Sequence, residues 1–313
     1  MQDKNANSRF GIDINQFTQN VDFRILATKV DFLYLRSSGS GTGSFRVDTK
    51  FLEFAKGSRD FGIPVGAYHY ALPSNDFTTA DSQCDEFIDL LQKGFGKNDY
   101  GDLFPVVDVE TPTDKSISTE TLVKWVDRFR KRFERKTRRR LMLYTGAFFV
   151  EIYDNFKLSD GSQPLKNMPL WIAMYTAIPG NPDFPPNVGG WTRWRMWQYT
   201  ESEIVEGTGN PVDGNWGPNS VDLLTQPRNV AGLCAGRKGN MINICWSKNT
   251  DTDLLGYNLF ANNYWIGTVD ENDTAFSIKI SQLPFTVVGP VKISIEAFDY
   301  DGETSKKRST ITV

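Results

Sequence analysis

The 313-residue sequence contains one histidine, three cysteines and no large excess of either charge. With no second histidine and no cysteine near His69, zinc coordination and Ser-His-Asp catalysis are both disfavoured, and we expect neither a metal nor a cofactor. The cysteines, Cys84, Cys234 and Cys245, are too few and too far apart for a disulfide framework. Cys234 and Cys245 could lie on neighbouring strands and pair, but free buried thiols are the expectation that we favour.

Long hydrophobic runs and a strong net charge are also missing. No stretch of about 18 apolar residues is present, so we expect no membrane span. The segment Met1–Arg9 is polar and lacks the apolar region of a signal peptide, which predicts synthesis in the cytoplasm. The net charge of −3 argues against a general nucleic-acid binder, which is usually basic. The composition is that of a soluble globular protein whose core needs no disulfide or metal.

The first two thirds of the chain alternate short apolar runs with amphipathic stretches. This alternation predicts βα units around a parallel sheet, and eight strands would close a barrel. The apolar periodicity thins out after the fifth strand, so we expect an irregular barrel there. The expected strands are Phe10–Ile14, Asp31–Arg36, Ile63–Tyr70, Phe104–Glu110, Leu141–Thr145, Leu170–Tyr175, Trp194–Tyr199 and a short Asn210–Asp213. The expected helices are Asp48–Phe61, Thr79–Lys93 and Ser118–Lys136.

The pattern changes near Gln226–Pro227, which predicts two domains, 1–226 and 227–313. From Arg228 onward no helical period is visible, and six or seven short alternating runs are separated by turn residues. That pattern is typical of an all-β, immunoglobulin-like sandwich. The pieces PRNV, ICW, GYNLF, EAFDYDG and ITV resemble a fibronectin type III domain. In such a domain Trp246 and Tyr257 would pack the core.

Carboxylates at predicted strand ends are the best candidates for chemistry. Asp108 and Glu110 lie two residues apart in VVDVE, so they point to the same face at the end of the fourth strand. Two adjacent, partly desolvated carboxylates raise the pKa of one of them, and glycoside hydrolysis needs such a general acid. The pair alone is weak evidence, because a surface acidic pair looks the same. Asp13 and Asp213 end two other strands, and three strand ends would deliver acids to one mouth.

Seven short motifs occur in an order that resembles the family 25 glycoside hydrolases, the muramidases of the Chalaropsis type. They are GIDIN (Gly11–Asn15), GAYHYA (Gly66–Ala71), PVVDVE (Pro105–Glu110), LYTG (Leu143–Gly146), LWIAMY (Leu170–Tyr175), WQYT (Trp197–Thr200) and PVDGN (Pro211–Asn215). The resemblance covers about Phe10–Leu224. It implies a TIM-like β/α barrel of five βα units and three further strands. It also implies an N-acetylmuramidase that hydrolyses the β-1,4 bond between N-acetylmuramic acid and N-acetylglucosamine in bacterial peptidoglycan.

The resemblance also assigns roles to the four acids. It implies that Glu110 protonates the leaving oxygen, that Asp108 tunes this acid, and that Asp13 and Asp213 flank the site. Asp222, in SVDLL, is the rival of Asp213, which we favour because PVDGN matches the family's segment. Three routes stay open: attack by a carboxylate, attack by the substrate's own N-acetyl group, or attack by an activated water. We favour the N-acetyl route, because adjacent acids suit an amide N–H.

Polar and aromatic residues near the strand ends are expected to bind substrate. The segment LRSSGSGTG departs from the family pattern, and Arg36 takes the place of the usual cation. The resemblance places Tyr68 and His69 at the cleft wall, His69 in a structural or binding role. Further candidates lie at or near strand ends, and we expect about half of them to line the cleft and the rest to pack the barrel. They are Tyr144, Trp171, Tyr175, Trp197, Gln198 and Tyr199.

Other interpretations remain open at this level. The barrel could be a glycan-binding pseudo-enzyme or a chitin-type glycosidase, and the C-terminal domain could serve as a protein-docking module or a wall anchor. The basic run Arg128–Arg140 fits a solvated helix face better than a site for anionic polymers. Without a signal peptide, an enzyme that cuts walls would act after lysis, after release, or from within a particle.

Overall fold

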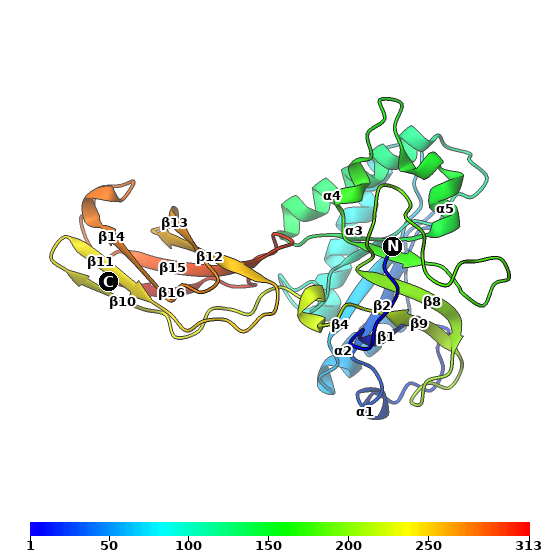
Figure 1. The fold of residues 1–313 in the computed structure, drawn as a ribbon, viewed down its shortest axis with the longest axis horizontal. Coiled ribbons are helices and arrows are strands. Elements are labelled where there is room, and N and C mark those ends of the chain that lie inside the picture. Colours follow the sequence, from blue (N-terminus) through cyan, green and yellow to red (C-terminus); the bar gives the residue numbers. More distant parts are fainter. The chain divides into compact units, whose positions relative to one another are not determined.

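The computed structural model describes residues 1–313 and divides into two compact units, Met1–Leu224 and Thr225–Val313 (Figure 1). The division falls beside Gln226–Pro227, where the sequence pattern changes. Each unit has a hydrophobic core of its own. No helix of the protein combines the length and the apolar character that crossing a membrane requires.

The N-terminal unit is a closed barrel of eight strands, which confirms the predicted mixed α/β barrel. Parallel pairing runs from β1 through β2, β4, β5, β6 and β7 to β8, and β9 closes the barrel by pairing antiparallel with both β8 and β1. A two-residue strand, β3 (Arg46–Val47), pairs antiparallel with β2 outside the barrel. The barrel strands are β1 (Phe10–Ile14), β2 (Phe32–Gly39), β4 (Val65–Tyr70), β5 (Val106–Asp108), β6 (Met142–Gly146), β7 (Leu170–Ala173), β8 (Met196–Glu203) and β9 (Val212–Trp216).

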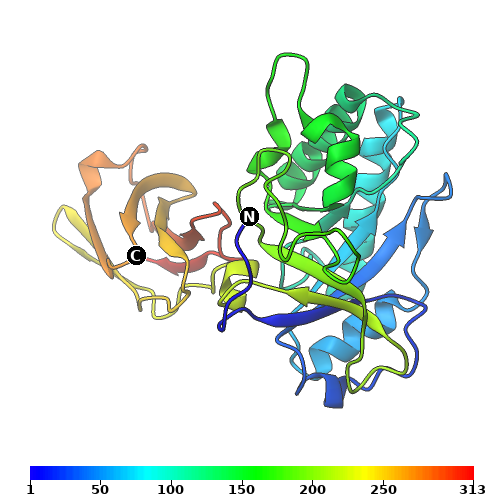
Figure 2. The ribbon, with the colours of Figure 1, turned by 45° about the vertical axis from the view of Figure 1, so that its right-hand side comes forward.

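A helix follows each of the first five barrel strands, and none separates β7, β8 and β9 (Figure 2). Three helices were expected, whereas the short first and last ones were not. The five are α1 (Phe23–Leu26), α2 (Phe51–Asp60), α3 (Thr78–Phe95), α4 (Thr119–Thr137) and α5 (Ala147–Ile152). Three 3₁₀ turns complete the unit: η1 (Asp154–Phe156), η2 (Pro164–Asn167) and η3 (Val221–Leu224).

Helix α4 illustrates how the sequence specifies an element. Ser118 caps it by accepting a hydrogen bond from the Thr121 N–H at 3.0 Å. Its apolar stripe, which includes Trp125 and Phe129, is fully buried. The charge of the basic run Arg128–Arg140, which starts within α4, is largely neutralised. Arg128 forms an ion pair with Asp81 of α3, and Arg132 forms one with Asp85 of the same helix, each at 2.6 Å. The run therefore joins two helices.

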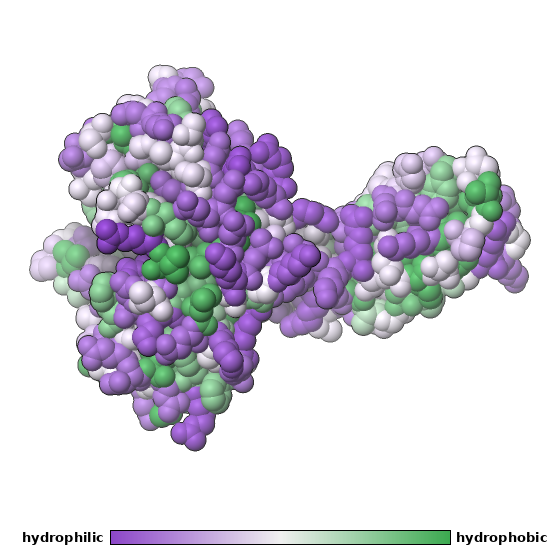
Figure 3. All heavy atoms as spheres, turned by 180° about the vertical axis from the view of Figure 1, so that it is seen from behind, coloured by the Kyte–Doolittle hydropathy of each residue, from purple (hydrophilic) through white to green (hydrophobic).

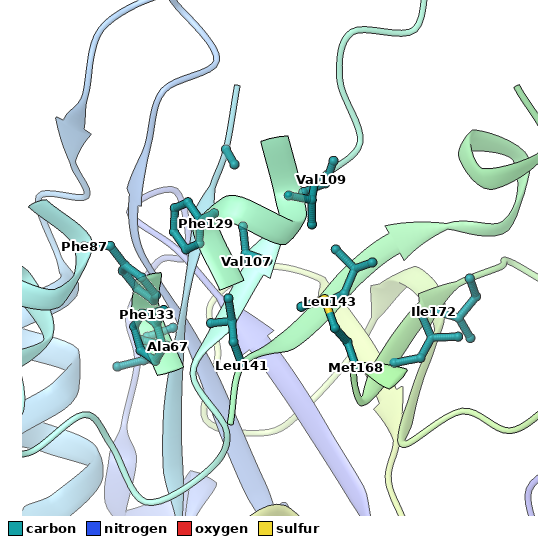
Figure 4. Packing of buried hydrophobic residues seen from close by; sticks show 14 of the residues in the cluster. Ala67, Phe87, Val107, Val109, Phe129, Phe133, Leu141, Leu143, Met168 and Ile172 are labelled. Atoms are coloured by element: carbon teal, nitrogen blue, oxygen red, sulfur yellow. The ribbon is translucent and has the colours of Figure 1, made fainter. Parts of the chain in front are cut away.

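Alternation along the strands separates two apolar layers. Side chains that point outward pack under the helices, where Figure 4 shows Ala67 and Val107 beside aromatic rings of α3 and α4. Leu143 and Ile172, from the next two strands, lie on the side of Met168. Side chains that point inward form a smaller cluster inside the barrel, which includes Tyr34, Met142 and Trp171. A Cβ at Gly66 would lie 2.5 Å from the Tyr34 ring, so the absence of a side chain there makes room for that ring. The interior of the barrel is thus filled by side chains and is not an open channel.

The C-terminal unit is all-β and consists of two antiparallel sheets that share one core. One sheet has the order β10-β11-β14 and the other β13-β12-β15-β16. The strands are β10 (Cys234–Lys238), β11 (Met241–Cys245), β12 (Leu254–Ala261), β13 (Tyr264–Asp270), β14 (Ala275–Lys279), β15 (Lys292–Asp299) and β16 (Ser309–Thr312), with a 3₁₀ turn η4 (Ile280–Gln282). Trp246 and Tyr257 are buried with ring centroids 5.3 Å apart. Apolar residues also reach the surface of this unit (Figure 3), among them Trp265 and Val288.

The expectation of three free thiols was wrong for two of the cysteines. Cys234 and Cys245 are directly opposite each other on β10 and β11, with Cα atoms 5.1 Å apart, and they form a disulfide. Both are exposed rather than buried. Cys84 is the remaining free thiol and lies in the core, where burial raises its pKa to about 12.

Candidate active site

A cavity of about 340 Å³ opens where the barrel strands end. Residues from all eight barrel strands, and from the segments that follow β1, β5 and β7, surround it. This is the end of a β/α barrel at which active sites are found. The lining residues are Asp13, Asn15, Arg36, Tyr68, Tyr70, Asp108, Glu110, Tyr144, Trp171, Tyr175, Gln198, Glu201 and Asp213.

Asp13 and Asp213 form a pair of neighbouring carboxyls in the wall of this cavity. They are directly opposite each other on β1 and β9 and share a hydrogen bond. Asp13 is 4% exposed, and burial together with the charge of Asp213 holds the pKa of Asp13 well above its ordinary value. The shared hydrogen bond opposes the rise for Asp213, whose pKa burial nevertheless raises. Two buried carboxyls at hydrogen-bond distance favour a state in which they share one proton.

Asp13 is fixed by an amide network that reaches the aromatic wall. Its Oδ2 accepts hydrogen bonds from Gln198 Nε2 at 3.0 Å and from Asn215 Nδ2 at 2.8 Å. The Gln198 amide oxygen in turn accepts from the hydroxyls of Tyr144 at 2.8 Å and Tyr175 at 2.9 Å. The two tyrosines are therefore held in place by the same glutamine that orients Asp13.

Asp108 is a buried carboxyl with an unused acceptor. It is 4% exposed, and its Oδ1 has no hydrogen-bond partner. Burial, the charge of Glu110 and the charge of Asp13 raise its pKa strongly, and Arg36 opposes the rise only in part. Arg36 is itself bound to the buried Asp48, with its Nε 3.0 Å from the carboxylate. A buried acceptor without a partner is costly unless a ligand completes it.

Glu110 lies at the border between this cavity and a second one. It follows β5 by two residues, on the same side of the strand as Asp108, and it is less buried than Asp108. Burial and the charge of Asp213 raise its pKa. The second cavity, of about 230 Å³, shares Glu110, Tyr144 and Tyr175 with the first. Glu110 can therefore meet a ligand that spans both cavities.

Three of the expected binding residues lie outside the cavity. His69, Trp197 and Tyr199 occupy outward-facing positions of β4 and β8, between residues that face inward. His69 is fully buried, its ring nitrogens lie 3.0 Å from Ser38 Oγ and 3.1 Å from Gln83 Oε1, and burial lowers its pKa to about 4. Trp197 donates to the Met174 carbonyl, and Tyr199 stacks on Trp216. Trp197 and Tyr199 therefore pack the barrel, as part of their group was expected to do, and His69 does not line the cavity.

The cavity also contains residues that the sequence analysis missed. Asn15 and Tyr70 lie two positions beyond Asp13 and Tyr68, so the same alternation would have found them. Glu201 had no such signal, because β8 shifts register on both sides of Thr200 and breaks the alternation. Asp222, the rival of Asp213, lies in η3 and does not line the cavity.

The arrangement suits acid-assisted cleavage of an acetal. A carboxyl whose pKa is raised can protonate a leaving oxygen near neutral pH, and nearby carboxylates stabilise a positive charge that develops on the carbon left behind. Each of the four acids singled out from the sequence lines this cavity.

Similar proteins support this chemistry. The spore cortex lytic enzyme SleM of Clostridium perfringens is 57% identical in sequence, with a TM-score of 0.98 over 100% of this chain and 99% of that one. An N,O-diacetylmuramidase of Arthroderma benhamiae is 28% identical over 68% of this chain and 85% of its own length. The catalytic domain of endolysin ply40 from bacteriophage P40 of Listeria monocytogenes has the same fold, at 24% identity and a TM-score of 0.55, over 70% of this chain and 97% of that one.

The last two similarities cover about two thirds of the chain, whereas the first extends over both units. The family described as "Glycosyl hydrolases family 25" matches residues 12–208, which lie within the barrel. The match includes Asp13, Asp108 and Glu110, and Asp213 lies just beyond it. The chain thus belongs to family 25 of the glycoside hydrolases.

Proposed function

We propose that the barrel is a muramidase, which hydrolyses the β-1,4 bond between N-acetylmuramic acid and N-acetylglucosamine in bacterial peptidoglycan. Glu110 is the general acid that protonates the leaving oxygen. The observation that carries this proposal is the position of Glu110, a carboxyl of raised pKa at the border of two cavities. Family membership and the N,O-diacetylmuramidase relative support the same substrate class.

The sugar whose anomeric carbon reacts occupies the acidic cavity in this proposal. Positive charge develops on that carbon, and the acids of this cavity are where it is stabilised best. Asp13 and Asp213 contribute electrostatically, and Tyr68 and Trp171 form the apolar wall. Arg36 contacts a polar substituent of the sugar.

We favour a substrate-assisted route in which the N-acetyl oxygen attacks the anomeric carbon. The bond to the leaving oxygen breaks as Glu110 gives that oxygen its proton. Water later attacks the anomeric carbon and opens the cyclic intermediate, and the proton that it loses returns to Glu110. The unpartnered Oδ1 of Asp108 supports this route, because it is an acceptor for the N–H of the acetamido group. Retention of the anomeric configuration, followed by NMR of fresh product, is the expected result. Inversion would instead indicate direct attack by water.

The wall that this chain cuts is, in our proposal, the spore cortex. The 57% identical protein over the whole chain is a spore cortex lytic enzyme, and the two chains share both units. We further propose that the C-terminal unit is a fibronectin type III-like sandwich that docks the enzyme on the wall or on a protein there. Its sheets of three and four strands and its Trp246–Tyr257 pair support this fold. Action would follow release from the cytoplasm by lysis, by another route, or from within a particle.

The test is digestion of purified peptidoglycan by the wild type and by Glu110→Gln, with mass spectrometry of the fragments. The wild type should leave reducing N-acetylmuramic acid ends. Loss of a general acid typically costs about 100- to 10,000-fold in rate, so the variant should leave almost none. Binding without cleavage by the wild type would indicate a glycan-binding pseudo-enzyme, and faster cleavage of chitin than of peptidoglycan would indicate a chitinase.

A further inference from the structure

The second cavity, beside Glu110, differs in chemistry from the first. Its walls are mainly apolar, and no lysine or arginine lines it. Apart from the shared Tyr144 and Tyr175, its ionisable groups are Glu110 and Glu151. The lining residues are Glu110, Tyr144, Gly146, Ala147, Phe148, Glu151, Ala173, Met174, Tyr175, Ile178, Asn181, Pro182 and Pro186.

Phe148 is the most exposed aromatic ring of this cavity. It is the second residue of α5, is 57% exposed, and has no aromatic partner among the ring contacts of the barrel. A Cβ at Gly146 would lie 2.7 Å from an edge atom of the Phe148 ring, so the ring rests against the bare backbone at the end of β6. An exposed ring held in this way, beside a catalytic acid, is a surface on which an apolar sugar face can stack.

The polarity of the cleavage reaction decides which sugar meets this ring. The acidic cavity takes the sugar on which positive charge develops, and Glu110 protonates the oxygen at the border. The leaving sugar therefore extends into the second cavity. In the proposed reaction that sugar is N-acetylglucosamine, whose acetamido group ends in a methyl.

We propose that the second cavity binds the leaving N-acetylglucosamine, with Phe148 stacked on the ring and the acetamido methyl against Ala173 and Met174, and that it selects N-acetylated over de-N-acetylated glucosamine. Loss of the acetyl group removes the apolar contact and leaves an ammonium group. A cation beside Glu110 favours the carboxylate form of this residue and weakens it as an acid. The attraction of the ammonium to Glu151 offsets the lost contact, so the penalty falls on kcat more than on KM. This inference rests on the proposed function.

The experiment uses soluble, peptide-free glycan chains of the two alternating sugars in three forms: N-acetylated, de-N-acetylated at glucosamine, and re-acetylated with acetic anhydride. For the full-length wild type we expect de-N-acetylation to lower kcat on the order of tenfold near neutral pH, and re-acetylation to restore it. Phe148→Ala should raise KM for the N-acetylated chains roughly 3- to 10-fold. Gly146→Ala, which displaces the ring, should act in the same direction. Phe61→Ala, an aromatic residue of similar exposure at the end of α2, is the matched control and should change neither constant.

The outcomes separate this inference from the proposed function. No cleavage of the N-acetylated chains by the wild type would overturn the proposed function. Cleavage of all three forms at equal rates, or an unchanged KM for both Phe148→Ala and Gly146→Ala, would overturn the inference alone. Circular dichroism and thermal unfolding of each variant check that the fold is retained.

Discussion

At the scale of single residues, the site is a set of carboxyls whose acid strengths are set by one another. Burial raises the pKa of each of the four carboxyls, those of Asp13, Asp108, Glu110 and Asp213. Ionisation of one of them also makes ionisation of its neighbours less favourable. Glu110 and Asp213 are both partly exposed and have raised pKa values, as a proton donor near neutral pH requires, and of the two only Glu110 lines both cavities.

The first expectation concerns the pH profile of Asp213→Asn. Glu110 must be protonated to act, so kcat/KM falls as pH rises through its pKa. The charge of Asp213 raises that pKa, and its removal should therefore move the basic limb of the profile to lower pH. The maximal rate should fall as well. Asp222→Asn, outside the cavity, should leave both the limb and the rate close to those of the wild type, and the reverse ranking of the two variants would contradict the assignment of Asp213.

A second expectation concerns stability. The folded-state pKa of Asp108 lies above its unfolded value, so its contribution to stability is present at low pH and is lost as pH rises through the folded-state pKa. At neutral pH we expect Asp108→Asn to melt a few degrees above the wild type, with an activity that is strongly reduced. The difference in Tm should vanish towards pH 3.

Asp85 provides a control of opposite sign. Its hydrogen bonds to Arg132 and Lys136 lower its pKa to about 2, so the stability that it contributes is present above the unfolded pKa, about 4, and is lost as pH falls towards 2. Asp85→Asn should therefore melt below the wild type at neutral pH. Scanning calorimetry across pH measures both variants, and shifts of the same sign would show that our account of the two carboxyls is wrong.

At the scale of elements, alternation along the strands explains most of what the sequence could predict. The barrel strands and the three longer helices follow from apolar periodicity, because burial of one face is imposed by the fold as a whole. The same alternation sorts Asp108 and Glu110 into the cavity and His69 out of it. Where the register shifts, as around Thr200, the alternation fails, and Glu201 could not be placed.

The disulfide in the C-terminal unit is a contact that spacing alone does not determine. Cys234 and Cys245 face each other only because β10 and β11 form a hairpin of a particular register. A register shifted by one residue would have placed them on opposite faces of the sheet. Strand patterns predict the two elements, whereas the pairing of their residues depends on the turn between them.

Removal of this disulfide should weaken one unit only. A loop of this length contributes about 3 kcal/mol when it is closed, so Cys234→Ser combined with Cys245→Ser should lower the unfolding free energy of the C-terminal unit by about that amount. Hydrogen exchange of peptides from this unit across a denaturant titration, with glycan cleavage for the barrel, measures the two separately. An equal loss in the barrel would show that the two units unfold together.

At the scale of the whole molecule, two units with separate cores divide the work of the chain. The acids, both cavities and the family match lie in the barrel. We therefore expect a chain that ends at Gln226 to fold and to cleave soluble glycan at a rate close to that of the full chain. If the C-terminal unit docks the enzyme, cleavage of intact cortex should fall by roughly tenfold or more, because the local concentration of enzyme is lost. If the shortened chain matched the full chain on intact cortex as well as on soluble glycan, the C-terminal unit would have no docking role.

The arrangement of the cysteines makes the protein a convenient subject for spectroscopy. Two of the three cysteines are joined to each other, and the thiol of the third, Cys84, is buried with a pKa of about 12. The thiolate is the form that reacts with alkylating dyes, so the wild type has almost no reactive cysteine at neutral pH. One cysteine introduced on the surface of each unit would accept a fluorophore pair, and energy transfer between the dyes would then report the distance between the barrel and its companion in solution and on a wall fragment.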